Sequence, residues 1–368
     1  MKRILLTTLA SVFALLLISC DGDYRSVADG NTREVVVVMD STQWESETAD
    51  AIRDVFGKWV LTVPNAEPYY DLRFTRIRSQ DQLERIRKQK NIIFVAPIDE
   101  ESNTGRQIRG FLDESLEQRV RSGDSFAFPI VDQWYRDQYA LILTSTSDSA
   151  LAQKIRNTEN SLLSNMLEKE LKRWEYFVYE RYEQTQYSDS LWENYGYKVR
   201  IQHDYIKNID TLNFHSFRRF LPENDRWMWT WHLDNVNDIS FLDQDWIIAT
   251  RDSLQELYIK GARDSMYVQT FVDDQERRPI VTESFQLGRL LTYETRGTWY
   301  MKNGLMGGPF VNFTYYDPDT KRLFMADYNQ FAPSVRQKLR FVRQFRAMGR
   351  TFQSDSTWTS QTNTVPNL

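Results

Sequence analysis

Three tryptophans, Trp227, Trp229 and Trp231, occupy alternate positions of a short segment. Because side chains alternate between the two faces of a strand, a strand here would place all three indoles on one face. An exposed row of this kind could stack on sugar rings or bases, and each indole would offer an N–H at its edge. A buried row would instead be the core side of a sheet. The sequence leaves both interpretations open and favours the core.

A carboxylate and a guanidinium, Glu294 and Arg296, share one face of another predicted strand. Such a pair could bind a polar ligand or take part in acid–base chemistry, although it is more commonly an ordinary ion pair. No second carboxylate can be placed opposite it from sequence, so the carboxylate pair of a glycosidase is not predicted. Trp299, Gly307 and Gly308 complete the candidate ligand-binding set, because the two glycines permit close approach of a ligand or a neighbouring chain. For the glycines, a bulge at the start of a strand is the favoured alternative.

Residue types that usually carry metal or nucleophilic chemistry are scarce. The three histidines, His203, His215 and His232, lack metal-ligand spacing, and the single cysteine excludes a disulfide framework and a cysteine-based zinc site. No serine lies in a Gly-x-Ser-x-Gly turn, and residues 305–310 lack the Lys-Ser/Thr of a phosphate-binding loop. We therefore predict no catalytic residue, no metal and no cofactor, and the sequence favours a non-enzymatic role.

A basic helix is predicted after Pro333 and up to Gly349. At 100° per residue, Arg336, Arg340 and Arg343 cluster opposite much of its apolar side. On an anchored protein this face could rest on anionic lipid headgroups or on an acidic partner. A solvated face that balances an acidic protein is the favoured interpretation.

One short pattern recurs seven times: aspartate, then serine or threonine, then alanine, isoleucine, leucine, valine, methionine or threonine. It resembles the O-glycosylation acceptor of exported Bacteroidota proteins. The structural alternative is that Asp-Ser pairs cap helices, which would suit Asp148 and Asp252. Both interpretations stay open, and the candidate O-glycosylation residues are Ser41, Ser149, Ser190, Thr211, Ser253, Ser265 and Ser356.

The N-terminus has the parts of an export signal. Lys2 and Arg3 precede an apolar run that is shorter than the ~20 residues needed to span a membrane, and the run ends in Leu17-Ile18-Ser19-Cys20. This end resembles a bacterial lipobox, a signal whose cysteine is acylated and becomes the first mature residue. We therefore predict a lipoprotein signal peptide over residues 1–19, lipidation (palmitate) at Cys20 and a tether over residues 20–32. The predicted location is the cell envelope, at the outer membrane, with the periplasmic or surface face left open.

The first half of the mature chain, residues 33–190, reads as an α/β domain. Runs at 34–39, 91–98 and 139–144 are rich in β-branched and aliphatic residues, as in strands buried on both faces. Helical patterns lie between them, and a long helical pattern over 148–187 closes this half. Alternating strands and helices predict an N-terminal α/β sandwich.

The second half, residues 191–350, reads differently. Segments such as 227–232 and 287–301 alternate in polarity and are joined by turn signals such as Lys302-Asn303-Gly304. This pattern predicts a C-terminal α+β domain, an antiparallel sheet with helices packed on it. Residues 351–368 are polar and are predicted as a disordered tail.

The composition limits the class of protein. The 46 basic and 51 acidic residues give a net charge of −5, which argues against an extensive nucleic-acid-binding surface. With 41% apolar and 14% aromatic residues, the chain can bury a core, so full disorder is excluded.

Taken together, these features resemble an uncharacterised Bacteroidota lipoprotein family, domain of unknown function 4837. The resemblance covers nearly the whole mature chain and is most specific in its second half. It is carried by the lipobox, residues 34–40 with Trp44, Glu67-Pro68, residues 294–299, residues 306–310 and Ala332-Pro333 before the last helix. It implies export and supports the glycosylation prediction, and it implies no activity, ligand or catalytic residue.

The sequence thus predicts a lipid-anchored cell-envelope protein with a non-enzymatic binding or scaffold role. The alternative is a glycan-binding or glycan-hydrolysing surface lipoprotein that uses the tryptophan row with Glu294 and Arg296. The predicted partners are the membrane, through lipidated Cys20, and an envelope protein or a glycan, but no nucleic acid. No oligomeric state is predicted.

Overall fold

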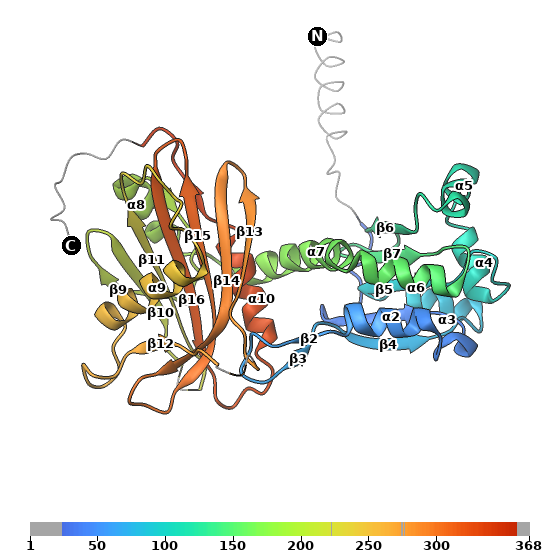
Figure 1. Cartoon of the computed structure of the whole chain (residues 1–368), viewed down its shortest axis with the longest axis horizontal. Coiled ribbons are helices and arrows are strands. Elements are labelled where there is room, and N and C mark those ends of the chain that lie inside the picture. The colour runs from blue at the N-terminus through green and yellow to red at the C-terminus, as the bar shows by residue number, and fades with distance from the viewer. Residues whose placement is uncertain (1–23, 222, 274, 276, 359–368) are drawn as a thin grey trace, which may run out of the picture. The chain divides into compact units, whose positions relative to one another are not determined.

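The computed structural model describes residues 24–221, 223–273, 275 and 277–358. The predicted signal peptide, Cys20 and the start of the tether lie outside the described residues. The chain forms two compact units, one from residues 1–50 and 72–154 and the other from 51–71 and 155–368. We call them unit one and unit two, and each is described by itself (Figure 1).

Unit one is built on a five-stranded sheet with the order β4-β1-β5-β7-β6. Its three central strands, β1, β5 and β7, run parallel and are almost wholly buried, whereas β6 is an antiparallel edge strand. Continuous β-branched runs suit such strands, because both faces are covered. The strands are β1 (Glu34–Val38), β4 (Asp71–Thr75), β5 (Asn91–Val95), β6 (Ala127–Val131) and β7 (Tyr139–Leu143).

Helices cover this sheet, and one hydrophobic cluster joins them to it. Leu83 and Ile86 of α3 and Ile108 of α4 pack with Phe94 and Ile142 of the sheet. Each of these helices has a serine or aspartate that caps its N-terminus. They are α3 (Gln80–Arg87), α4 (Asn103–Arg109) and α5 (Glu114–Ser122), and a short 3-10 turn, η1 (Ser41–Gln43), follows β1.

The division between the units differs from the predicted boundary at residue 190. The helical pattern over 148–187, which predicts one long helix or two abutting ones, forms two abutting helices, α6 (Asp148–Asn157) and α7 (Glu159–Tyr179). A further helix, α8 (Thr185–Tyr195), begins at its end, and α7 belongs to unit two. Leu167 and Leu171 of α7 pack against Ala347 near the C-terminus, which explains this assignment. The chain passes between the units at three places, which lie in α2 (Glu47–Phe56), in β4 and in α6.

Unit two is built on an eight-stranded antiparallel sheet. Its order is β12-β14-β15-β16-β11-β10-β9, and β13 pairs with the free part of β14. Two small two-stranded sheets, β2–β3 and β8–β17, accompany it. The large sheet consists of β9 (Ile206–Asp210), β10 (Phe214–Arg219), β11 (Asp225–Leu233), β12 (Val268–Thr270), β13 (Val281–Leu287), β14 (Leu290–Met301), β15 (Gly307–Asp317) and β16 (Arg322–Phe331); the small sheets consist of β2 (Trp59–Val60), β3 (Glu67–Pro68), β8 (Tyr197–Lys198) and β17 (Gln353–Ser354).

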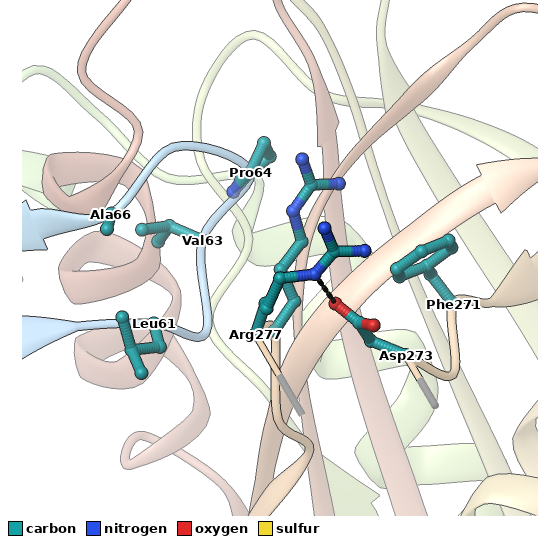
Figure 2. Close-up of a pocket in the computed structure, with 8 residues that line it drawn as sticks. Leu61, Val63, Pro64, Ala66, Phe271, Asp273 and Arg277 are labelled. Carbon is teal, nitrogen blue, oxygen red and sulfur yellow. Dashed lines mark ion pairs between the residues drawn. The ribbon is translucent and has the colours of Figure 1, made fainter. Parts of the chain in front are cut away.

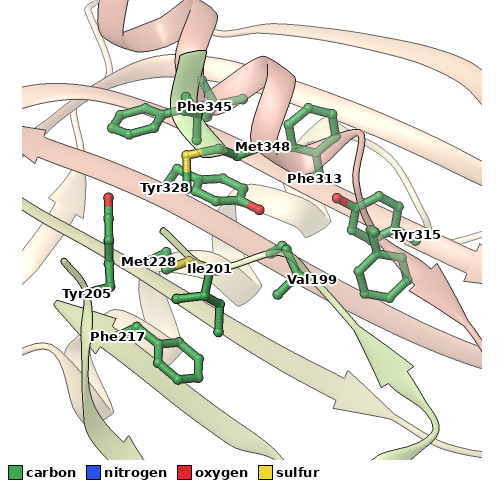
Figure 3. Packing of buried hydrophobic residues seen from close by; sticks show 14 of the residues in the cluster. Val199, Ile201, Tyr205, Phe217, Met228, Phe313, Tyr315, Tyr328, Phe345 and Met348 are labelled. Carbon is green, nitrogen blue, oxygen red and sulfur yellow. The ribbon is translucent and has the colours of Figure 1, made fainter. Parts of the chain in front are cut away.

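Both faces of the large sheet are covered. On one face, Phe345 and Met348 of α10 (Leu339–Gly349) pack with Phe313, Tyr315 and Tyr328 (Figure 3). On the other face, α9 (Gln244–Tyr258) packs through a second cluster that contains the tryptophans of β11. Because both faces of this sheet are covered, its strands bury polar as well as apolar side chains. A candidate site residue on these strands can therefore be buried and out of reach of a ligand.

The fold class predicted from the sequence is confirmed: a sheet with parallel strands in the N-terminal part and an antiparallel sheet with helices in the C-terminal part. The predicted disordered tail is wrong at its start. Phe352 is buried, because its ring stacks on Tyr315 at a centroid distance of 4.0 Å, and β17 follows it. Among the described residues, no helix is both long and apolar enough to cross a membrane.

Candidate binding pocket

The tryptophan row lies in the core of unit two. Trp227 and Trp229 are buried and Trp231 is half-buried, and all three belong to the cluster under α9. Trp299 of β14 is buried beside them, with its ring centroid 5.0 Å from that of Trp227. The row therefore packs the sheet and offers no open surface of three indoles for a sugar ring.

Glu294 and Arg296 lie on the opposite face of the sheet, in a cluster of charges next to α10. The Glu294 carboxylate is buried and lies 2.5 Å from Nε of Arg346 and 3.5 Å from nitrogens of Arg296 and Arg350. Arg296 also pairs with Glu283 at 2.5 Å. Burial alone would raise the pKa of Glu294, but the three guanidinium groups outweigh it and hold the pKa below its ordinary value. Glu294 is thus a fixed anion in an internal cluster, not a proton donor.

Gly307 and Gly308 begin β15, and their pairing with β14 is continuous, so the predicted bulge is wrong. A Cβ atom at Gly308 would lie 1.8 Å from the carbonyl oxygen of Gln330. The glycine is needed because a neighbouring strand, and not a ligand, comes this close.

The histidines do not form a metal site; across the described part of the chain, no cluster of ligand side chains could hold an ion. His203 is exposed, whereas His215 and His232 are buried beside the ring of Tyr195, at centroid distances of 4.5 and 5.6 Å. Nδ1 of His215 lies 2.8 Å from Oδ1 of Asp210. Burial lowers the pKa of His215, and burial together with other nearby cations lowers that of His232 to about 4.

The basic helix differs from the prediction. It begins at Leu339, not just after Pro333, and its N-terminus is capped by Glu67, whose Oε1 accepts from the backbone N–H of Lys338 at 2.5 Å and of Leu339 at 3.0 Å. Arg340 is exposed, as expected for a solvated face.

Arg343 on the same helix is not solvated. It forms a 2.6 Å ion pair with Glu170 of α7, and the two side chains are only 2% and 1% exposed. The predicted continuous basic face of Arg336, Arg340 and Arg343 is therefore wrong for Arg343. The reason is that α7 covers a second side of the helix, which its apolar periodicity alone does not reveal.

The candidate glycosylation residues are all accessible. Five of the hydroxyl residues are exposed and two are half-buried, namely Ser41 and Thr211. The helix-capping alternative holds at Asp40, which caps η1 by accepting from the backbone N–H of Thr42 at 3.1 Å. It does not hold at Asp148, because Ser147 accepts from the first turn of α6. Asp252 lies within α9 and accepts from the backbone of Thr270. The exposed residues are Ser149, Ser190, Ser253, Ser265 and Ser356.

A pocket of about 230 Å³ lies elsewhere in unit two, between two loops far apart in sequence (Figure 2). The loop between β2 and β3 supplies an apolar wall, and the segment between β12 and β13 supplies an aromatic ring and charged groups. None of these residues is among the candidates from the sequence, because nothing in either loop signals the other. The lining residues are Leu61, Val63, Pro64, Ala66, Phe271, Asp273, Arg277 and Arg278.

Both walls are tied to the framework of unit two. The first wall is a hairpin closed by the pairing of Val60 with Glu67, and Glu67 caps α10. In the second, the backbone N–H of Phe271 donates to the carbonyl of Thr298 at 2.8 Å.

The pocket combines apolar side chains with charged groups of both signs. Arg277 is 72% exposed, and its Nε lies 3.5 Å from a carboxylate oxygen of Asp273, which is only 6% exposed. Arg278 lies over the ring of Phe271, 5.6 Å from its centroid. Figure 2 shows Arg277 between Pro64 and Asp273.

Two family matches divide the chain. Residues 184–351 match a domain of unknown function, DUF4837, which is the family that the sequence resembles, and residues 28–178 match a second domain of unknown function, DUF8532. The resemblance to DUF4837 is thus located in the second half of the chain. No curated protein matches the sequence.

Solved structures give only distant likenesses. The Ran-binding protein Mog1p of Saccharomyces cerevisiae has 10% identity and a TM-score of 0.29, with 44% of this chain and 92% of that chain covered. Human StAR-related lipid transfer protein 5 has 10% identity and a TM-score of 0.22, with 45% and 91% covered. A protein from Bacteroides thetaiotaomicron has 8% identity and a TM-score of 0.22, with 44% and 46% covered. Similarities this low carry no argument about function.

Proposed function

We propose that this protein is a lipid-anchored protein of the cell envelope, held at the outer membrane through Cys20, with a non-enzymatic binding role at the pocket described above. The observation that carries the binding role is the pocket itself, in which apolar residues of one loop lie opposite an aromatic ring and charged groups of another. The anchor and the location rest on the export signal and lipobox sequence over residues 1–20.

The internal charges support a binding role over acid–base chemistry at the predicted residues. Glu294 is held by three arginines, as described above. Asp327 in the sheet accepts from Arg251 at 2.8 Å and from Asn312 at 3.0 Å, and Asp327 and Arg251 are wholly buried. Groups engaged in this way fasten α9 and α10 to the sheet.

Site-specific photocrosslinking in native membranes tests the binding role. A photoreactive phenylalanine analogue at Leu61, which is 39% exposed on the pocket wall, should yield a reproducible crosslinked product. The same analogue at Leu257, which is 58% exposed on α9 and does not line the pocket, is the matched control. Equal products at both positions, or none at Leu61, would count against binding at the pocket.

We also propose O-glycosylation at the seven predicted residues. Their accessibility supports this, because a transferase must reach each hydroxyl in the folded protein or in the exported chain. Intact mass spectrometry of protein purified from its native envelope should show added hexose-type mass. Seven unmodified hydroxyls would end the proposal.

A further inference from the structure

We infer that unit one rests on the surface of the membrane that holds Cys20, with one end of its sheet turned toward the lipid headgroups. This end is formed by residues 24–29, 87–90 and 131–137, and we call it the membrane-facing end. The inference rests on the lipid anchor proposed above and adds the surface that the anchored protein presents to the bilayer.

The segment after the predicted signal peptide is fastened to unit one from Arg25 onward. Nε of Arg136 donates to the carbonyl of Arg25 at 2.7 Å. The backbone N–H of Ala28 donates to the carbonyl of Arg136 at 2.9 Å, and that of Asp29 donates to the carbonyl of Lys88 at 2.7 Å. Residues 25–29 are thus bonded to unit one, within the stretch that the sequence predicts as a tether.

This attachment leaves only a short span of chain for the anchor. Four residues separate Cys20 from Arg25. A fully extended chain covers ~3.5 Å per residue, so Arg25 lies at most about 18 Å from Cys20. The acyl chains of a lipidated cysteine insert into the bilayer, which places the cysteine itself at the headgroups. The part of unit one that holds Arg25 is therefore close to the bilayer surface.

The attachment is made to a packed part of unit one, at the end where β5 and β7 begin. The side-chain amide of Gln138 donates to the carbonyls of Arg87 and Gln89, which ties the loop before β7 to the turn before β5. In the same loop, the ring of Trp134 packs edge-on against Phe94 of the core, at a centroid distance of 6.2 Å. The anchor therefore sets the orientation of the whole unit and not only the position of a loop.

Exposed apolar side chains lie at the membrane-facing end. Tyr24 is 84% exposed, and Val27 and Val131 are 49% and 52% exposed. Val27 bridges to Arg136, and Val131 pairs with Tyr139, the first residue of β7, so both valines lie at this end of the sheet. A tyrosine with an apolar ring and a polar tip suits the headgroup region, and contact with lipid would remove the two valines from water.

The other end of the sheet provides a control position. β5 and β7 each contain five residues and rise ~3.3 Å per residue, so about 17 Å of strand separates the two ends. Glu101 is exposed and follows β5 at the far end. A unit that rests on the membrane-facing end holds Glu101 away from the headgroups.

Fluorescence quenching of the full, lipidated chain in vesicles tests the inference. Cys20 is the only cysteine of the sequence and is acylated in the anchored protein, so an introduced cysteine is the one thiol that bimane can label. The vesicles consist of phosphatidylcholine and phosphatidylglycerol, with a nitroxide on a fraction of the headgroups. Bimane on Val27→Cys or Val131→Cys should lose most of its fluorescence, whereas bimane on the matched control Glu101→Cys should keep it.

The outcomes separate the inference from the proposed anchor. Equal quenching at all three positions, or quenching at residue 101 alone, would overturn the inference and leave the anchor in place. No quenching at residues 27 and 131 in a protein whose Cys20 is acylated by mass spectrometry would also overturn it. A Cys20 that is unmodified in protein purified from its native envelope would overturn the proposed anchor and the inference together.

Discussion

Replacing Arg343 by methionine is expected to lower the free energy of unfolding by about 3–5 kcal/mol, the cost of removing one partner of a buried ion pair. In the folded protein the guanidinium of Arg343 donates to Glu170 at 2.6 Å and to the carbonyl of Tyr69. Without it, the Glu170 carboxylate keeps a 3.1 Å hydrogen bond from the indole of Trp174 and stays buried. Methionine has a similar length, so the loss measures charge and hydrogen bonding more than packing.

Urea unfolding followed by tryptophan fluorescence measures the effect, and two variants make it decisive. Arg340→Met changes an exposed arginine on the same helix and should cost about 0.5 kcal/mol or less. Glu170→Leu combined with Arg343→Met removes both charges and should recover much of the loss, since apolar replacement of a buried pair is often near neutral. A surface ion pair is expected to contribute less than about 1 kcal/mol. If Arg343→Met costs no more than that, and no more than Arg340→Met, the result would refute the burial of Arg343.

Two further predictions concern other buried groups of unit two. The pKa of His232 is lowered from 6.5 to about 4 in the folded protein, so the unfolded chain binds the proton at higher pH than the folded chain does. Acidification from pH 7 to pH 4 should therefore lower the free energy of unfolding by about 3 kcal/mol. In urea titrations across this range, His232→Gln should lose less stability than the original protein, and the exposed control His203→Gln should lose the same amount. Gly308→Ala should lower the free energy of unfolding by about 3 kcal/mol or more in the same assay, because its Cβ would overlap the backbone oxygen of Gln330. Gly110→Ala is the control and should be close to neutral, because its Cβ would meet nothing nearer than 3.4 Å. Equal costs for the two substitutions would contradict the close approach of the strands at Gly308.

The strands of the two sheets could be predicted because their signal is local. Residues 35–38 and 92–95 are continuous apolar runs, and such runs are stable chiefly where a sheet is covered on both faces. The alternation in residues 290–301 likewise follows from the period of a strand. Each of these patterns is complete within a few residues.

Burial by distant segments could not be predicted. The apolar stripe of α10 predicts one covered side, but Arg343 is buried by α7 and by residue 69, which lie far from it in sequence. A charged residue buried by pairing looks the same in sequence as one in water. Glu294 gave the same difficulty, because two of its three arginine partners come from α10 and the segment after it.

The pocket could not be predicted for a related reason. Its two loops carry no motif, and they meet only because the hairpin of residues 59–68 joins unit two. A pair of adjacent arginines such as Arg277 and Arg278 has no distinctive spacing. Here the fold creates the site, and only the tertiary structure shows which loop faces which.

The cap of α10 by Glu67 has a consequence for the order of synthesis. The carboxylate and the backbone N–H of Lys338 are 271 residues apart, so the hairpin leaves the ribosome long before the helix that it caps exists. Unit two therefore cannot complete its fold until translation is nearly finished. In a chain truncated before residue 338, the hairpin that carries Glu67 would lack the helix that it caps and would be exposed to proteases. A fragment limited to residues 184–351 would lack both Glu67 and Glu170 and would leave the last helix uncapped and one of its arginines unpaired. The unit of folding is thus larger than the unit of sequence similarity.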